Sequence, residues 1–296
     1  MERFYRNLQK ISGSFFVSLP KKWVENYKLH AKSPVSIEIR SDGALLISPK
    51  LEQTDLDLKD ELVLSATPYV VRAIIKSSLS GQMNMVVISD KEIEKNLKYE
   101  IRRFVNGLPN TEITEERAQR IVIQNFGYKK IPTKKLIQRL LYLIENMFVD
   151  VKENARTDLL YNFEQLRKFY FILVTHIRTY LKTGIYVTED NDFTPLEAMD
   201  YRMFCEKIEE TGKILRVLHL SENVQDFYEK IFQYFKEVME AYMKDSQELA
   251  HYAWLKKDKI EKEAIALIAK LDYEDKDRIK DMIYMAHLIK DMAAVI

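Results

Sequence analysis

The chain has 296 residues, and its 46 Lys and Arg against 45 Asp and Glu give a formal net charge of +1 at pH 7. Such a balance creates no overall field that would draw the whole molecule to nucleic acid or to an anionic membrane, so any charged function must be local. The single cysteine, Cys205, excludes an intramolecular disulfide and every CxxC motif, and is typical of a reducing compartment. The length allows about two domains.

Hydropathy predicts a cytoplasmic protein without membrane insertion. The first residues, MERFYRNLQK, lack the apolar run of a signal peptide. The longest apolar run, near residues 169–174, is far shorter than the ~20 residues of a membrane span.

Glycine spacing excludes the enzyme classes with a glycine-rich phosphate loop. The chain has only seven glycines, and no two lie within six residues of each other. GxGxxG and GxxxxGK motifs need close glycines so that backbone N–H groups can reach phosphate, and both are absent. HExxH and GxSxG are absent too. We therefore expect a protein that is not an enzyme.

Residues 1–50 alternate short β-branched and aromatic runs with turns. The pattern predicts three strands at residues 13–20, 35–40 and 45–49, and a short helix at 21–27. Fifty residues of short strands rarely bury enough apolar surface to fold alone. We expect this segment to obtain its core by dimerising.

The same segment is locally basic. It holds nine Lys and Arg against four acidic residues, a local net charge of +5, which leaves −4 for the rest of the chain. A dimer would place two copies of the basic residues that flank the first hairpin on one face, where they could meet DNA phosphates. The alternative is an ordinary solvated surface. The candidate DNA contacts are Arg3, Arg6, Lys10, Lys21 and Lys22.

Three runs in this segment, at residues 8–14, 17–24 and 45–49, carry a glycine turn, a strand ending in Leu19-Pro20, a one-turn helix and a strand ending near proline. Over residues 3–50 the pattern resembles the SpoVT/AbrB swapped-hairpin domain. The resemblance implies that two chains interlace their hairpins into one barrel, and that the five basic residues above contact DNA. Lys32-Ser33-Pro34 departs from the glycine–aspartate turn that the family usually has. Some such domains serve antitoxins or only dimerise.

The rest of the chain divides into three parts. Residues 51–63, with five acids and one lysine, are typical of a solvated connector. Residues 64–130 predict an α/β adaptor, and residues 131–296 predict a bundle of about five or six helices. In the adaptor we expect helices at 69–79 and 91–105 and strands at 83–88 and 118–125. In the bundle we expect helices at 133–156, 158–182, 195–219, 224–271 with a break, and 273–296.

The order of these parts behind an AbrB-like head resembles the archaeal-type PhoU-like regulators over most of residues 60–296. The resemblance is carried by residues 69–75 with Gly81, 140–147, 168–174 and 202–210. It implies a role in phosphate uptake, with a phosphate transporter or a sensor kinase as a partner.

PhoU proteins carry E/DxxxD signatures whose carboxylates can gather iron or another divalent metal. Glu206 and Glu210 match that signature, and Asp291 lies at the corresponding place in the last helix. The resemblance thus makes these three residues candidate metal ligands. Arg167 replaces an aspartate that the family usually has, and the alternative is an acidic stripe that faces solvent.

Together these features predict a multidomain α+β protein, with a dimeric AbrB-like swapped-hairpin barrel, an α/β adaptor and a PhoU-like all-α bundle. The leading hypothesis is a homodimeric DNA-binding transcriptional regulator of phosphate uptake. A second hypothesis is a PhoU-like interaction protein whose head only dimerises. A third is a carboxylate-bridged metal enzyme in the bundle.

Overall fold

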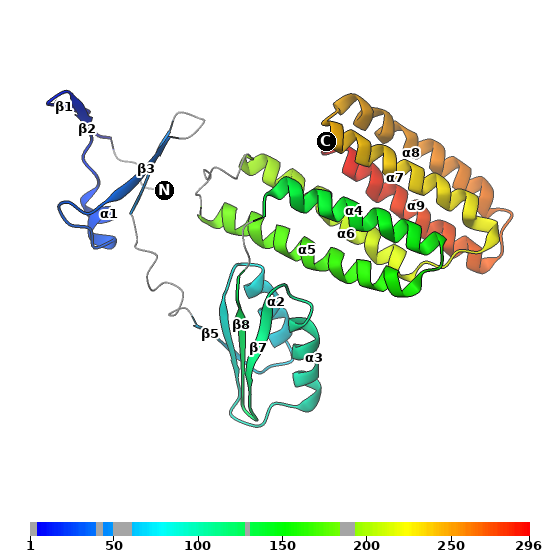
Figure 1. The fold of residues 1–296 in the computed structure, drawn as a ribbon, viewed down its shortest axis with the longest axis horizontal. Helices are drawn as coiled ribbons and strands as arrows, with labels where there is room; N and C mark the ends of the chain where they lie inside the picture. Colours follow the sequence, from blue (N-terminus) through cyan, green and yellow to red (C-terminus); the bar gives the residue numbers. More distant parts are fainter. Residues whose placement is uncertain (1–4, 40–43, 50–60, 128–130, 184–192) are drawn as a thin grey trace. The chain divides into compact units, whose positions relative to one another are not determined.

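The computed structural model describes residues 5–39, 44–49, 61–127, 131–183 and 193–296, and the chain divides into two compact units, Met1–Lys59 and Asp60–Ile296 (Figure 1). We call the described part of the first unit, residues 5–39 and 44–49, the head. The second unit contains the adaptor, residues 61–127, and the helical bundle, residues 131–183 and 193–296.

The head consists of two antiparallel strand pairs and one short helix. Its elements are β1 (Gln9–Ile11), β2 (Ser14–Phe16), α1 (Lys21–Asn26), β3 (Val35–Ile39) and β4 (Leu45–Pro49). Between β1 and β2, Ser12 and Gly13 have φ angles of 49° and 89°, as a two-residue type I′ turn requires. The sequence pattern missed β1, and β2 is only three residues long where a strand over 13–20 is expected.

The adaptor is a four-stranded mixed sheet with two helices on one face (Figure 1). Its elements are β5 (Glu61–Ser65), α2 (Val70–Ser78), β6 (Asn84–Ile88), α3 (Lys95–Val105), β7 (Thr111–Glu116) and β8 (Arg120–Asn125). The strand order is β5-β6-β8-β7, in which β5 pairs with β6 in parallel and the other pairs are antiparallel. Apolar side chains of α2 and α3, such as Ile74 and Ile101, pack on Met85 and Ile121 of the sheet to form its core.

The sequence prediction was wrong for two strands of this sheet. Residues 61–63, assigned to the acidic connector, belong to β5, while residues 51–60 lie outside the described residues. In β5 Leu62 and Leu64 face the core and Glu61 and Val63 face outward, so the acidic residue does not prevent a strand. β7 was missed because its sequence, TEITEE, contains one apolar residue.

The bundle consists of six helices within the described residues, in agreement with the expected five or six. They are α4 (Thr133–Lys152), α5 (Arg156–Thr183), α6 (Pro195–Val217), α7 (Gln225–Lys244), α8 (Gln247–Ile268) and α9 (Tyr273–Ala293), with a short 3₁₀ turn η1 (Glu222–Val224) before α7. Helices α4, α5 and α6 pack together, α7, α8 and α9 pack together, and α6 packs on α9 (Figure 1). All six contribute to one apolar core. No helix in the described part of the chain is long and apolar enough to span a membrane.

A buried carboxylate ties the turn before α7 to the first turn of α9. Asp275 is 1% exposed, and its carboxylate accepts hydrogen bonds from Ser221 Oγ at 2.6 Å and from Asn223 Nδ2 at 2.9 Å. Arg278 forms an ion pair with the same carboxylate. The Ser221 hydrogen bond, followed by the Asn223 bond, holds the pKa of Asp275 below its usual value because both favour the charged form.

The Asp275→Asn variant is therefore expected to melt at a lower temperature than the original protein at pH 7. A lowered folded-state pKa stabilises the fold above the unfolded pKa of about 4, and that stability is lost as the pH falls through the folded pKa. Thermal melts followed by circular dichroism between pH 7 and pH 3 would show the two midpoints converging in acid. A midpoint difference that stays constant over this range would contradict the assignment.

Candidate nucleic-acid interface

The basic residues predicted to contact DNA lie around the hairpin and helix of the head. Lys10 lies in β1, Lys21 and Lys22 are the first two residues of α1, and Arg6 precedes β1; all four are exposed. Arg3 lies outside the described residues. The positions of the four follow from local structure, because the Ser12-Gly13 turn orients the hairpin and Pro20 precedes the first turn of α1.

Arg6, Lys10 and Lys21 each make an exposed contact with a residue near them in the chain. Lys10 lies opposite Phe15 in the hairpin, with Nζ 6.0 Å from the centre of its ring. Lys21 Nζ lies 3.6 Å from Glu25 Oε1, and the two side chains are 87% and 63% exposed. Such an exposed pair is worth little in water, so it does not prevent Lys21 from turning to a phosphate. Arg6 donates a hydrogen bond to the backbone oxygen of Tyr5 at 3.0 Å.

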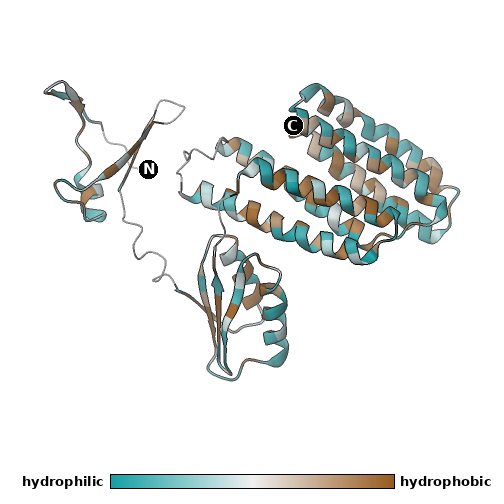
Figure 2. Ribbon diagram, in the orientation of Figure 1, coloured by the Kyte–Doolittle hydropathy of each residue, from teal (hydrophilic) through white to brown (hydrophobic). Residues whose placement is uncertain are grey.

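A single head has no buried core. None of its residues whose burial the structure describes is buried, whereas many of its large apolar side chains are between 45% and 86% exposed. Figure 2 shows apolar residues along its strands. They include Tyr5, Leu8, Ile11, Phe15, Phe16, Val17, Tyr27, Ile37, Ile39 and Leu45. Exposed apolar surface of this extent on so small a unit marks an interaction surface.

An apolar hollow of about 550 Å³ lies between α1 and β4 of the head. Leu19, Trp23, Leu45 and Ile47 line it, together with Pro20, Lys22 and Asn26. Lys22 thus borders apolar surface as well as solvent. Sequence reasoning identified the basic residues of the head and expected its core to come from a dimer, but it did not name the apolar residues that are exposed. The adjacent Phe15 and Phe16 in a two-stranded hairpin are the signal that could have found this surface.

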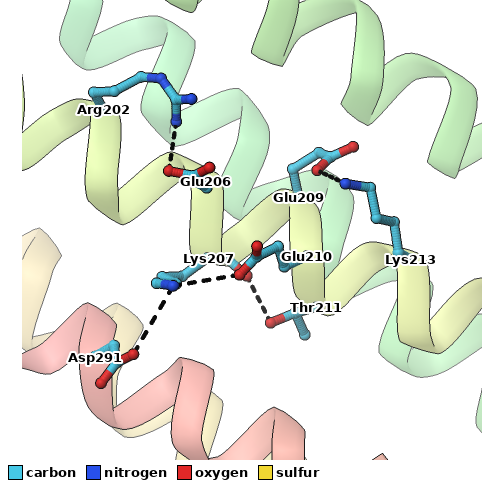
Figure 3. A network of polar contacts seen from close by, with 8 residues as sticks. All are labelled: Arg202, Glu206, Lys207, Glu209, Glu210, Thr211, Lys213 and Asp291. Atoms are coloured by element: carbon cyan, nitrogen blue, oxygen red, sulfur yellow. Dashed lines mark hydrogen bonds and ion pairs between the residues drawn. The ribbon is translucent and has the colours of Figure 1, made fainter.

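The three candidate metal ligands in the bundle are engaged by cations of the chain itself (Figure 3). Arg202 donates to Glu206 Oε2 at 2.9 Å, and Lys207 Nζ lies 3.4 Å from Glu210 Oε2 and 3.9 Å from Asp291 Oδ2. Across residues 5–39, 44–49, 61–127, 131–183 and 193–296, no three His, Cys, Asp or Glu side chains form a group that could hold a metal ion. The structure therefore supports ion pairs at these carboxylates, and we do not propose a metal site there.

Comparison with known proteins finds a match for the head. Residues 8–53 match a family described as "Antidote-toxin recognition MazE, bacterial antitoxin". The matched segment contains Lys10, Lys21 and Lys22, and begins after Arg3 and Arg6. No curated protein and no solved structure matches the chain. The likeness to PhoU-like regulators over residues 60–296 has no support from these comparisons. The match supports a MazE/AbrB-like, swapped-hairpin DNA-binding domain at the N-terminus. Because it covers less than a fifth of the chain, it says nothing about the bundle.

Proposed function

We propose that this protein is a homodimeric DNA-binding transcriptional regulator whose two heads together hold operator DNA. The observation that carries the proposal is the combination of a MazE/AbrB-like segment with four exposed basic residues around its hairpin and helix. Lysine and arginine side chains on an exposed hairpin can bind phosphates without a preformed pocket, because counterion release supplies most of the affinity.

Dimerisation follows from the missing core of the head. Burying the exposed apolar side chains of β1 to β4 against a second copy would contribute roughly 25 cal/mol per Å² of apolar surface. The hairpin aromatic residues and the hollow beside Trp23 are surfaces that a second head can cover. A dimer also doubles the number of basic residues that face one stretch of DNA.

The proposal also covers which genes are regulated and what the bundle does. We propose that the genes serve phosphate uptake and that the bundle senses phosphate status or docks a transporter or sensor-kinase component. This part depends only on the resemblance of residues 60–296 to PhoU-like regulators.

Sequencing the DNA fragments that the purified full-length protein retains from its own sheared genome tests the proposal. Retention at two salt concentrations is expected to enrich fragments upstream of phosphate-transport genes. With about eight phosphate contacts in a dimer, affinity should fall about 10³-fold or more between 50 and 200 mM salt. Retention that is absent, or spread evenly over the genome, would contradict the regulator. Enrichment at other genes would keep the regulator and remove the phosphate assignment.

A second candidate function has a specific observation in its favour. The description of the matched family names recognition of a toxin and does not mention DNA. We propose as the alternative an interaction protein in which the head only dimerises or binds a protein, while the bundle regulates a partner. Charge reversal in the head separates the two functions, because only the regulator needs the basic side chains.

A further inference from the structure

One end of the bundle contains a hollow that no part of the proposed function uses. Its volume is about 340 Å³, within the range of small-ligand sites. The start of α4 contributes Lys134, the start of α6 contributes Asp200 and Tyr201, and the end of α7 contributes Tyr242 and Asp245. These three helix ends, together with Val295 and Ile296 after α9, build one concave surface that the sequence could not show.

The charges that line this hollow are mostly negative. Glu197, Asp200 and Asp245 supply three carboxylates, and Lys134 is the basic residue among the lining residues. Within the described residues neither Asp200 nor Asp245 forms an ion pair. Glu197 already accepts a hydrogen bond from the backbone N–H of Thr194 at 2.6 Å as part of the cap of α6. Asp200 and Asp245 therefore keep their accepting capacity for a ligand.

Two tyrosines add aromatic surface and hydroxyl groups. The Tyr242 ring stacks on the buried Phe204 with centroids 4.6 Å apart, which fixes its orientation. Within the part of the chain that the structure describes, neither Tyr201 nor Tyr242 makes a side-chain hydrogen bond. Burial raises the pKa of Tyr201, and Glu197, Asp245 and Asp200 raise it further, so all three carboxylates act on that one hydroxyl. The hollow is thus lined by carboxylate groups, phenol hydroxyls and aromatic rings.

We propose that this hollow binds a small organic cation that carries a primary amine or a guanidinium group. An ammonium offers three N–H donors and a guanidinium five, which suits two unpaired carboxylates and two phenol oxygens. Aromatic rings also attract cations through their negative faces. Because the three carboxylates outnumber the single ammonium group of Lys134, the hollow should repel an anion such as phosphate. This inference goes beyond the proposed function and does not depend on DNA binding.

Isothermal titration of agmatine into the full-length protein tests the inference, because agmatine carries both an amine and a guanidinium. One saturable site per chain is expected, with affinity that falls as salt rises. The neutral diol 1,4-butanediol, similar in chain length, and inorganic phosphate should not bind there. Asp200→Asn and Asp245→Asn should each weaken agmatine binding by about tenfold or more, because each removes one charge-assisted hydrogen bond.

The variants are chosen so that folding is kept. Asp245 ends α7 in a left-handed conformation with a φ angle of 50°, which asparagine also tolerates, and Asp200→Asn retains the shape of the side chain. Asp258→Asn on α8, an exposed change outside the hollow, is the matched control and should bind agmatine normally. The inference would be overturned if agmatine does not bind, if it binds equally to the Asp200 and Asp245 variants, or if phosphate binds in its place.

Discussion

Replacing both Arg6 and Lys10 by glutamate is expected to abolish specific DNA binding. The double change removes two positive charges per chain and adds two negative ones, so a dimer would present repulsion where it had four phosphate contacts. Affinity should fall by about 10³-fold or more at physiological salt, and each lost contact should lower the salt slope by about one. Both side chains are exposed, so the fold should be unaffected.

Fluorescence anisotropy with a retained genomic fragment measures the effect, and light scattering checks that the variant is still a dimer. The matched control is Lys259→Glu with Lys262→Glu, which makes the same charge change at exposed positions of α8. The control should lose little affinity. If the head variant binds DNA as well as the control does, the head is not the DNA interface, and the interaction protein becomes the better proposal.

The bundle could be predicted well because its signal is periodic. Apolar residues such as Leu136, Leu140 and Met147 recur at helical spacing, and all three are buried in the core. The breaks between helices were harder to locate. The expected helix over 224–271 breaks at Asp245 and Ser246, where Asp245 is left-handed and the Ser246 side chain accepts the N–H of Leu249. Neither glycine nor proline marks this break in the sequence.

The edge strands of the adaptor could not be predicted for a different reason. β7 is mostly glutamate and threonine, and it becomes a strand because β8 supplies its hydrogen-bond partners. Arg102 of α3 also forms an ion pair with Glu116 at the end of β7. Partners of this kind come from the tertiary fold, and local composition does not reveal them.

The candidate sites show the same division between local and tertiary information. Arg202 and Glu206 form an i,i+4 ion pair on one helix, so the sequence alone could have predicted that the Glu206 carboxylate is paired. The approach of Asp291 on α9 to Lys207 on α6 depends on how the two halves of the bundle pack. The basic cluster of the head and its need for a second copy could both be predicted from the sequence, but the apolar hollow between α1 and β4 needed the structure.

Replacing Gly212 by valine is expected to destabilise the bundle strongly. Gly212 lies within α6, where glycine is otherwise unfavourable by about 1 kcal/mol relative to alanine. A Cβ atom at this position would lie 2.5 Å from Leu166 Cδ2 and 3.5 Å from Ile144 Cδ1. Both neighbours are fully buried, so they have little room to move. Overpacking should lower the free energy of unfolding by about 3 kcal/mol.

Urea unfolding of Gly212→Val measures this loss, and a second substitution identifies its cause. Adding Leu166→Ala removes the atom closest to the new side chain, so the double variant should be more stable than the sum of the two single effects predicts. Met199→Val, an exposed change in the same helix, shows what a valine costs α6 where it meets no buried neighbour, which should be only about 0.5 kcal/mol. Additive effects of the Gly212 and Leu166 changes would show that α6 does not need glycine for its contact with α5.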